Sequence, residues 1–331
     1  MGLTVDSICM RKVALLYNQR SGGGRANRRP EVEAALQHLQ AAGVDATLTV
    51  TVSSADAGEQ ARLAIAAGCD TVLACGGDGT IHDVIQGMAG SQAALGVLPM
   101  GTANALAHDL GLPLHPAKAA RALQQAQRKR IALGRVELPS LAGSTITRYF
   151  TVAVGIGVDA HLFYKLNSAT KQKLGMAAYY AKAWQLWFSH QMQSFSVQYG
   201  GATASRDQQL LATEMLAVRI RNFGGVLREL APGASLDRDD LRLLVCRTDN
   251  RLSYLSYVTR TLLGANWQVS GVELVHAPAV RCDYAGESKN GSTRPRGKVY
   301  VEADGELIGT LPAEITMVPD ALTILVPPRT D

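Results

Sequence analysis

The chain has 331 residues, a length that favours two domains over one. Apolar residues make up 47% and charged residues 18%, which supplies a buried core and excludes a disordered protein. The formal net charge of +5 fits an anionic ligand or a membrane surface, but it is too small to indicate a nucleic-acid-binding protein.

The cysteines exclude two structural classes. All 5 lie far apart and none forms a C-x-x-C pair, which excludes a disulfide scaffold and a cysteine zinc site and favours a reducing compartment. No stretch approaches the length of a membrane span, and the N-terminus lacks a signal-peptide core. We therefore expect a cytoplasmic protein.

The first third of the chain alternates strand patterns with helical patterns. The strand patterns are Val13–Tyr17, Ala46–Val52, Thr71–Cys75 and Ala94–Leu98, and the helical patterns are Glu31–Ala42, Gly58–Ala67, Ile81–Met88 and Asn104–Leu110. This alternation predicts βαβ units, with a parallel sheet and helices on both faces.

β-rich runs dominate after about Arg135, and they predict a mostly antiparallel domain. They are Arg148–Val154, Gln193–Tyr199, Ala212–Arg221, Leu241–Arg247, Val280–Tyr284 and Lys298–Ala303. We predict an α/β protein with a first domain at residues 11–135 and a second at 136–319. The closing strand pattern at 320–328 can join either domain, and its return to the first domain is left open.

Residues 160–206 form a basic, aromatic insertion without a single carboxylate. Its cations include Lys165, Lys171, Lys173 and Lys182, and its aromatic residues include Trp184, Trp187 and Phe188 at helical spacing. Aromatic residues at helical spacing often pack in a hydrophobic core, but a basic amphipathic helix also suits an anionic membrane surface. Both interpretations stay open, and the insertion is the candidate membrane contact.

Three glycine-rich turns follow strand patterns of the first domain. They are Asn18–Gly24, Gly76–Thr80 and Gly101–Asn104. Glycine turns can be plain connections, but exposed N–H groups at the carboxyl ends of parallel strands bind anions. Three such turns on one sheet edge predict phosphate binding.

Asp78 lies inside the second turn, where a bare carboxylate would repel a phosphate. A divalent cation between the two removes the repulsion, so Asp78 suggests Mg²⁺ and a nucleoside triphosphate rather than NAD. Thr80 and Asp83 also match a capping-box pattern, which would make Thr80 a structural cap. None of the turns is a P-loop or a Rossmann fingerprint.

Two motifs resemble the diacylglycerol kinase and sphingosine kinase superfamily of lipid kinases. They are Gly76-Gly77-Asp78-Gly79-Thr80 and Leu98-Pro99-Met100-Gly101-Thr102-Ala103-Asn104. The first is shared with NAD kinases and, more loosely, with phosphofructokinases, whereas the second motif and the insertion favour lipid kinases. The resemblance covers nearly the whole chain.

The resemblance implies an NAD kinase/diacylglycerol kinase-like fold, with an N-terminal nucleotide domain and a C-terminal β-sandwich. It implies that Asp304 or Glu306 is the general base, although Asp304-Gly305 also reads as a hairpin turn. The implied ATP-binding residues are Asn18, Gln19, Arg20, Ser21, Gly22, Thr51, Gly76, Gly77, Asp78, Gly79, Thr80, Ile81, His82 and Thr102.

Several positions depart from the family pattern. Ala105 and Ala132 stand where relatives often carry acids that support a magnesium–water network. Arg238 interrupts the Leu-Asp-Asp-Gly segment that builds a structural metal site, although Asp237 and Asp240 remain as candidate ligands. The metal ligands that we predict are therefore Asp78, Asp237 and Asp240.

These features predict an ATP- and Mg²⁺-dependent lipid kinase of phospholipid metabolism. It would phosphorylate a hydroxyl of a diacylglycerol-like or sphingoid lipid at a membrane surface, with peripheral contact through 160–206 and no nucleic-acid partner. A homodimer is left open. The alternatives are a soluble NAD-kinase-like enzyme and a catalytically silent nucleotide- or lipid-binding module.

Overall fold

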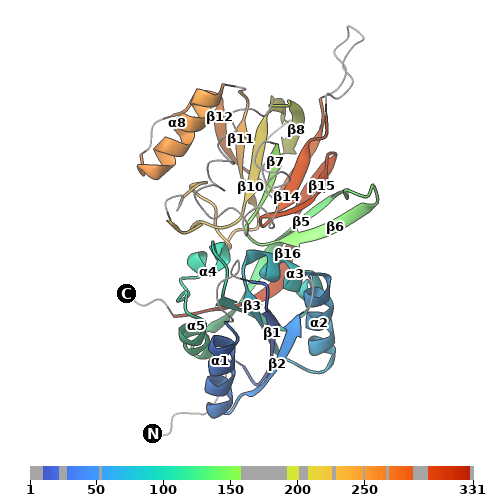
Figure 1. The fold of residues 1–331 in the computed structure, drawn as a ribbon. Coiled ribbons are helices and arrows are strands. Elements are labelled where there is room, and N and C mark those ends of the chain that lie inside the picture. The colour runs from blue at the N-terminus through green and yellow to red at the C-terminus, as the bar shows by residue number, and fades with distance from the viewer. Residues whose placement is uncertain are drawn as a thin grey trace. The chain divides into compact units, whose positions relative to one another are not determined.

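The computed structural model describes residues 10–21, 28–51, 54–157, 192–200, 208–225, 229–248, 250–265, 268–285 and 297–328 (Figure 1). The chain divides into two compact units. Unit 1 comprises Met1–Leu133 and Pro319–Asp331, and unit 2 comprises Gly134–Val318. The chain passes from one unit to the other within β5 (Gln127–Pro139) and again within β16 (Ala313–Val326).

Unit 1 contains a parallel sheet, as predicted. Its strand order is β2-β1-β3-β4, and the C-terminal part of β16 pairs with β4 through Thr323 and Ile324. The bounds are β1 (Lys12–Asn18), β2 (Asp45–Thr51), β3 (Thr71–Gly76) and β4 (Ala94–Pro99). β3 and β4 are buried along their whole length, which explains their continuous apolar runs.

Helices cover both faces of this sheet. In Figure 1, α1 and α5 lie on one side, while α2 and α3 pack together on the other. The helices are α1 (Arg29–Ala41), α2 (Ser54–Ala66), α3 (Asp78–Met88), α4 (Ala105–Asp109) and α5 (Pro116–Gln124). The buried face of α1 carries Val32, Ala35 and Leu39, the spacing that predicts an amphipathic helix.

Unit 2 is a β-sandwich of two mostly antiparallel sheets, which confirms the predicted fold class. One sheet has the order β12-β11-β10-β7-β14-β15. In the other, the N-terminal part of β16 is followed by β13, β8 and β9, and β5 pairs with β6. The remaining bounds are β6 (Thr145–Phe150), β7 (Ala153–Gly157), β8 (Phe195–Gly200), β9 (Gln208–Ala212), β10 (Glu214–Val218), β11 (Leu241–Cys246), β12 (Val272–Ala277), β13 (Ala279–Tyr284), β14 (Tyr300–Ala303) and β15 (Glu306–Thr310).

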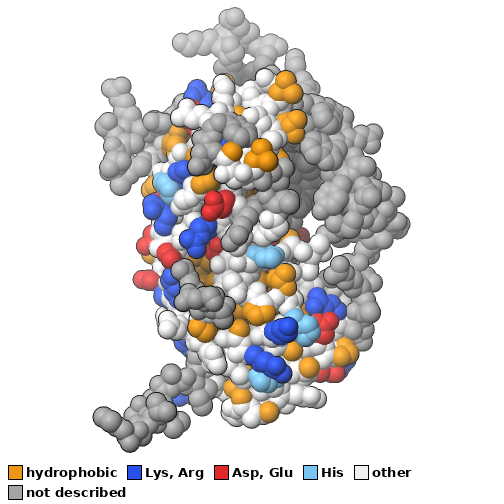
Figure 2. Space-filling model, turned by 90° about the vertical axis from the view of Figure 1, so that its left-hand side faces the viewer, with side chains coloured by type: hydrophobic (Ala, Val, Ile, Leu, Met, Phe, Trp, Pro, Cys, Tyr) orange, Lys and Arg blue, Asp and Glu red, His pale blue; other side chains and the backbone are white. Residues whose placement is uncertain are grey.

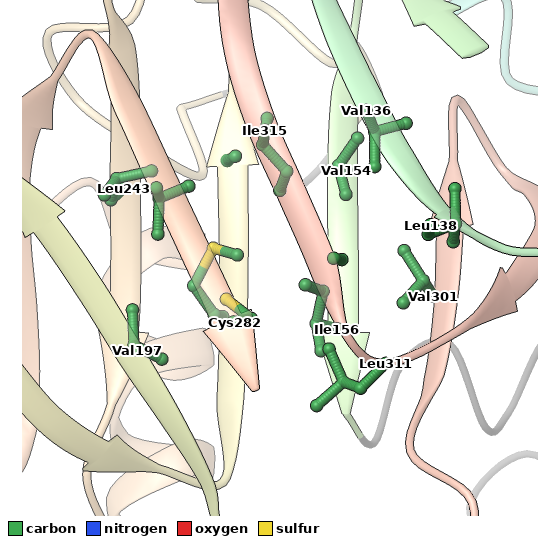
Figure 3. Packing of buried hydrophobic residues seen from close by; sticks show 14 of the residues in the cluster. Val136, Leu138, Val154, Ile156, Val197, Leu243, Cys282, Val301, Leu311 and Ile315 are labelled. Carbon is green, nitrogen blue, oxygen red and sulfur yellow. The ribbon is translucent and has the colours of Figure 1, made fainter. Parts of the chain in front are cut away.

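The core of unit 2 lies between these two sheets. Figure 3 shows Val154, Ile156 and Val301 from the first sheet in the same cluster as Cys282 and Ile315 from the second. All five side chains are fully buried. Because residues alternate between the two faces of a strand, the neighbours of Val154 and Ile156 on β7 face away from this core.

Helix α8 (Arg251–Leu262) lies outside the sandwich sheets and anchors to unit 2 through Tyr257, whose hydroxyl donates to the carbonyl oxygen of Leu230 at 2.5 Å. Exposed leucines lie in its first turn and directly after its last residue, because Leu252 is 72% exposed and Leu263, its C-cap, is 69% exposed. Figure 2 shows hydrophobic side chains interspersed with basic ones on the face that carries α8. Among the described residues, no helix is both long and apolar enough to cross a membrane.

Candidate active site

The three predicted glycine-rich turns follow neighbouring parallel strands of unit 1. β1 ends at Asn18, β3 at Gly76 and β4 at Pro99, and the three strands are adjacent in the order β1-β3-β4. Their carboxyl ends therefore meet at one edge of the sheet, where ligands of α/β proteins bind. Thr51 ends the next strand, β2, and its buried hydroxyl donates to the carbonyl oxygen of Tyr17 at 3.3 Å.

The second and third turns touch each other backbone to backbone. A Cβ atom on Gly101 would lie 2.6 Å from the Cα of Gly77, and one on Gly77 would lie 3.0 Å from the Cα of Gly101. The N–H of Met100 also donates to the carbonyl oxygen of Gly76 at 2.8 Å. Only glycine permits this approach, so two of the three turns form one continuous backbone surface.

Asp78 joins these two turns through its carboxylate. Its Oδ2 accepts the N–H of Asn104 at 2.8 Å and its Oδ1 accepts the N–H of Ala105 at 2.7 Å. Asn104 has a left-handed backbone (φ 51°), and its own Oδ1 accepts the N–H of Gly101 at 2.8 Å. The side chains of Asp78 and Asn104 therefore fix the path of the third turn.

Asp78 can still serve a hydrated Mg²⁺. Each oxygen of an ionised carboxylate can accept more than one partner, so the two backbone N–H groups do not exclude a metal-bound water. Mg²⁺ in nucleotide sites is usually held by one or two carboxylates and by the phosphates, with water completing its shell. The single carboxylate of Asp78 fits this type of site, although no acid stands at Ala105 or Ala132 to assist it.

Thr80 links the first turn to the second, and it does not cap its helix. α3 begins at Asp78, and its N-cap is Gly77 without a side-chain cap. The Thr80 hydroxyl instead accepts the amide N–H of Asn18 at 2.9 Å and contacts the Ser21 hydroxyl at 3.2 Å. The capping-box interpretation of Thr80 was wrong because the helix begins at Asp78, three residues earlier than the apolar pattern indicated.

The other predicted nucleotide residues differ in accessibility. The side chains of Gln19, Arg20 and Thr102 are exposed, so they are available to a ligand. Ile81 and His82 are buried in α3, at 2% and 3% exposure. Gly22 lies outside the described residues.

In unit 2 the two predicted acids lie on the hairpin between β14 and β15. Asp304 and Gly305 both have positive φ (50° and 84°), as a tight two-residue turn requires. The Asp304 carboxylate is buried and accepts three backbone N–H groups, from Thr151 at 3.1 Å, Val152 at 2.8 Å and Ala153 at 3.1 Å. Glu306, two residues later, is exposed.

Two further residues of these sites were not singled out from the sequence. Asn104 was noted only as a member of its motif, yet its side chain makes two hydrogen bonds to Gly101. Glu302 on β14 is buried, and its Oε2 accepts the N–H of Gly305 at 2.8 Å. An alternating strand pattern would place such a glutamate in solvent, so local sequence carried no signal for it.

The predicted ligands Asp237 and Asp240 lie in the turn before β11. The Asp240 carboxylate accepts the Arg238 guanidinium at 2.7 Å and lies 3.3 Å from the His276 imidazole. These contacts, chiefly the hydrogen bond from Arg238, hold the pKa of Asp240 below its usual value. Within the described parts of the chain, no group of three or more His, Cys, Asp or Glu side chains is arranged to hold a metal.

Comparison with known proteins agrees with this arrangement along the whole chain. The diacylglycerol kinase catalytic domain family matches residues 12–136, and the YegS C-terminal NAD kinase beta sandwich-like domain family matches residues 152–326. A diacylglycerol kinase of Bacillus subtilis is 26% identical over 321 residues, covering 96% of this chain and 97% of that protein. A diacylglycerol kinase of Mycobacterium tuberculosis is 28% identical over 319 residues, covering 96% and 95%.

Solved structures show the same fold. A diacylglycerol kinase structure from Bacillus anthracis has a TM-score of 0.69 at 18% identity, covering 97% of this chain and 99% of that one. The yeast NADH kinase has a TM-score of 0.57 at 10% identity, covering 97% and 84%.

The chain belongs to the diacylglycerol kinase superfamily, the family that its two motifs predicted. It is a kinase, a phosphotransferase that uses a nucleotide as its phosphoryl donor.

Proposed function

We propose that this kinase transfers the γ-phosphate of ATP to a hydroxyl group of a diacylglycerol-like or sphingoid lipid. The observation that carries the proposal is the contact of Gly77 with Gly101, which joins two glycine turns at the edge of the parallel sheet. The relatives named diacylglycerol kinase match over nearly their full length, which supports a lipid acceptor.

In this proposal the backbone of unit 1 binds the phosphates. The second turn and the N-terminus of α3 follow β3 at this sheet edge, and N–H groups at such a place are suited to anionic oxygens. Asn18, Ser21 and Thr80 hold the first turn against the second, so the N–H groups are oriented before ATP binds. Bound Mg²⁺ would neutralise phosphate charge, with Asp78 as its protein ligand.

Unit 2 supplies the acid that accepts the proton of the lipid hydroxyl. A general base must reach the proton that it removes. The buried Asp304 carboxylate already accepts three N–H groups, whereas Glu306 is exposed on the same hairpin. We therefore assign the proton transfer to Glu306 and the positioning of the hairpin to Asp304.

A phosphoryl-transfer assay with several acceptors tests the proposal. The full-length protein is given radiolabelled ATP and Mg²⁺ with diacylglycerol, monoacylglycerol, sphingosine or ceramide in mixed micelles, and separately with NAD⁺ in solution. We expect label in a lipid and none in NAD⁺. Asp78→Asn, which removes one carboxylate charge, measures the background of the preparation.

Two results would contradict the proposal in different ways. Labelling of NAD⁺ alone would make the protein an NAD-kinase-like enzyme, the alternative that the Gly76–Thr80 motif left open. ATP binding without transfer to any acceptor would favour the silent nucleotide-binding module.

A further inference from the structure

The turn that precedes β11 is strongly charged. Leu236-Asp237-Arg238-Asp239-Asp240, here called the acidic turn, carries three carboxylates and one guanidinium. Asp237, Arg238 and Asp239 are exposed, and Asp240 is half-buried. The family resemblance implied a structural metal at this turn, with Asp237 and Asp240 as candidate ligands.

A buried arginine lies directly behind the acidic turn. Arg219 follows β10, has no solvent exposure and is one of the largest fully buried side chains among the described residues. Its Nη1 donates to the carbonyl oxygen of Arg238 at 2.6 Å and to that of Asp240 at 2.8 Å. One guanidinium nitrogen therefore bridges two backbone oxygens that a hard cation would use as ligands.

The charge of Arg219 is compensated by the same turn. Burial lowers the pKa of Arg219 to about 10, and the negative charges of Asp239 and Asp240 act in the opposite direction. The guanidinium is therefore protonated at neutral pH. A buried cation is tolerated where carboxylates and carbonyl dipoles surround it, which is the same environment that a structural metal requires.

The acidic turn does not fit a divalent cation in addition to this guanidinium. Its carbonyl oxygens at Arg238 and Asp240 are occupied by Arg219, and the Asp240 carboxylate is occupied by Arg238 and His276. A divalent ion at hydrogen-bond distance from Nη1 would meet strong like-charge repulsion. The remaining carboxylates, Asp237 and Asp239, are exposed and do not form a three-ligand group with other described residues.

We propose that the Arg219 guanidinium takes the place of a structural metal ion beneath the acidic turn. A covalently attached cation binds the two carbonyl oxygens, and Arg238 supplies a second positive charge to Asp240. The loop on the N-terminal side of the turn is held in a similar way, because Nε of Arg242 donates to the carbonyl oxygen of Pro232 at 2.7 Å. Unit 2 then needs no divalent cation to hold this turn, and its stability is independent of metal concentration.

Thermal unfolding of the full-length, nucleotide-free protein tests this inference without using activity. We compare the unfolding temperature in excess EDTA, in Mg²⁺ and in Ca²⁺, and measure the metal content of the purified protein by elemental analysis. The expected result is one unfolding temperature, within about 1 °C, and no stoichiometric metal. A fall of several degrees in EDTA, reversed by either ion, would show that the turn binds a metal and would overturn the inference.

Substitutions of Arg219 test the cation itself. Arg219→Met keeps the length of the side chain but removes its charge and donors, and we expect the unfolding temperature to fall by at least about 5 °C. Arg219→Lys keeps one charge and three donors, so it should recover part of that loss. Arg247→Met is the matched control, because Arg247 makes an exposed ion pair with Glu273, and it should change the unfolding temperature by about 1 °C or less.

A gain of metal dependence completes the test. In the double variant Arg219→Met, Arg238→Asp the carbonyl oxygens are released and a fourth carboxylate enters the turn. Ca²⁺ or Mg²⁺ should then raise its unfolding temperature, whereas neither ion raises that of the wild type. If Arg219→Met unfolds at the wild-type temperature, the guanidinium does not stabilise the turn and the inference fails. Should Arg219→Met fail to fold, the EDTA comparison on the wild type still decides it.

Discussion

Asp78 contributes to this site through its geometry as well as its charge. Both of its oxygens accept N–H groups of the third turn, at 2.8 and 2.7 Å, so the residue orients one loop while it lies at the start of another. A carboxylate that is already ordered by two donors loses little entropy when it also binds a hydrated cation.

This double role predicts a large catalytic defect for Asp78→Asn. The amide keeps one acceptor oxygen but places its NH₂ group against a backbone N–H, and it removes the charge that would bind Mg²⁺. We expect kcat/KM to fall by about 10³-fold, the scale of losing a main electrostatic element. Steady-state rates over a range of Mg²⁺ concentrations measure it, and thermal unfolding reports the loss of the loop contacts separately. A rate above about a tenth of wild type, with an unchanged Mg²⁺ requirement, would remove Asp78 from the metal site.

Substitutions of the two acids in the β14–β15 hairpin should change different measured quantities. Glu306→Gln removes the proposed proton acceptor from an exposed position, so kcat should fall by about 10²–10⁴-fold while ATP affinity and unfolding temperature stay near wild type. Asp304→Asn removes an acceptor from three buried N–H groups, so it should lower the unfolding temperature as well as kcat.

Unfolding curves and ATP titrations of both hairpin variants check this assignment. The opposite pattern, with Asp304→Asn stable and inactive and Glu306→Gln fully active, would make Asp304 the base. Weaker ATP binding in both variants, with kcat unchanged, would make the hairpin a nucleotide contact.

At the scale of elements, the two glycine turns are expected to work as one unit. In Gly101→Ala the new Cβ would lie 2.6 Å from the Cα of Gly77, so the turns must separate by about 1 Å. A displacement of that size near reacting groups costs on the order of 10²-fold in rate, so kcat/KM for ATP should fall by about that factor.

Ala103→Ser is a matched control for Gly101→Ala. It adds one heavy atom to the same turn at an exposed position, and it should leave the rate within about twofold of wild type. Rates measured for the two variants side by side decide the question. Equal rates would show that the contact between the turns does not matter for the reaction.

Local sequence patterns predicted the strands and turns around the site more successfully than they predicted the contacts between its residues. The buried runs of β3 and β4 and the glycines after them are local signals, so both turns could be found from the sequence. α5 was not predicted, because two of its four buried residues are alanines, which are weak apolar signals. α8 was also missed, since its apolar residues include exposed leucines that break the helical periodicity.

Contacts between distant residues were beyond the reach of local patterns. The partners of Asp304 lie about 150 positions away in the chain, at Thr151, Val152 and Ala153. In the sequence, Arg219 lies near the end of the strand pattern Ala212–Arg221. Only the tertiary structure brings its guanidinium beneath Asp240. Long-range pairing of this kind depends on topology, which a single sequence specifies only through the complete fold.

At the scale of the whole molecule, the proposed lipid acceptor requires a surface that meets a membrane. The described residues contain no helix that is long and apolar enough to cross a membrane. The predicted membrane segment, 160–206, lies outside the described residues except at 192–200, and its role stays a prediction. The exposed leucines of α8 provide a second apolar surface, in the described part of unit 2, for comparison.

We expect the basic insertion to bind anionic vesicles. Each lysine near an anionic surface contributes about 1 kcal/mol, weakened by salt, so Lys165, Lys171, Lys173 and Lys182 give reversible binding. We expect the loss of vesicle co-sedimentation and slower turnover on vesicle lipid in one triple variant, which combines Lys171→Glu, Lys173→Glu and Lys182→Glu. Its turnover of a short-chain soluble analogue should survive. The control is a second triple variant, which combines Lys118→Glu, Arg121→Glu and Lys298→Glu outside the insertion. It changes the net charge by the same amount and should leave vesicle binding largely intact.

The soluble analogue separates docking from catalysis. If the insertion variant loses activity on the analogue and on vesicles alike, residues 160–206 form core or active-site wall and the docking prediction is wrong. A double variant, Leu252→Ser with Leu263→Ser, tests the apolar surface at α8, where these two side chains are 72% and 69% exposed. If the insertion variant binds vesicles normally and this double variant does not, the apolar surface at α8 is the membrane contact. Salt distinguishes the two surfaces, since 0.5 M NaCl weakens binding through lysines far more than binding through buried leucines.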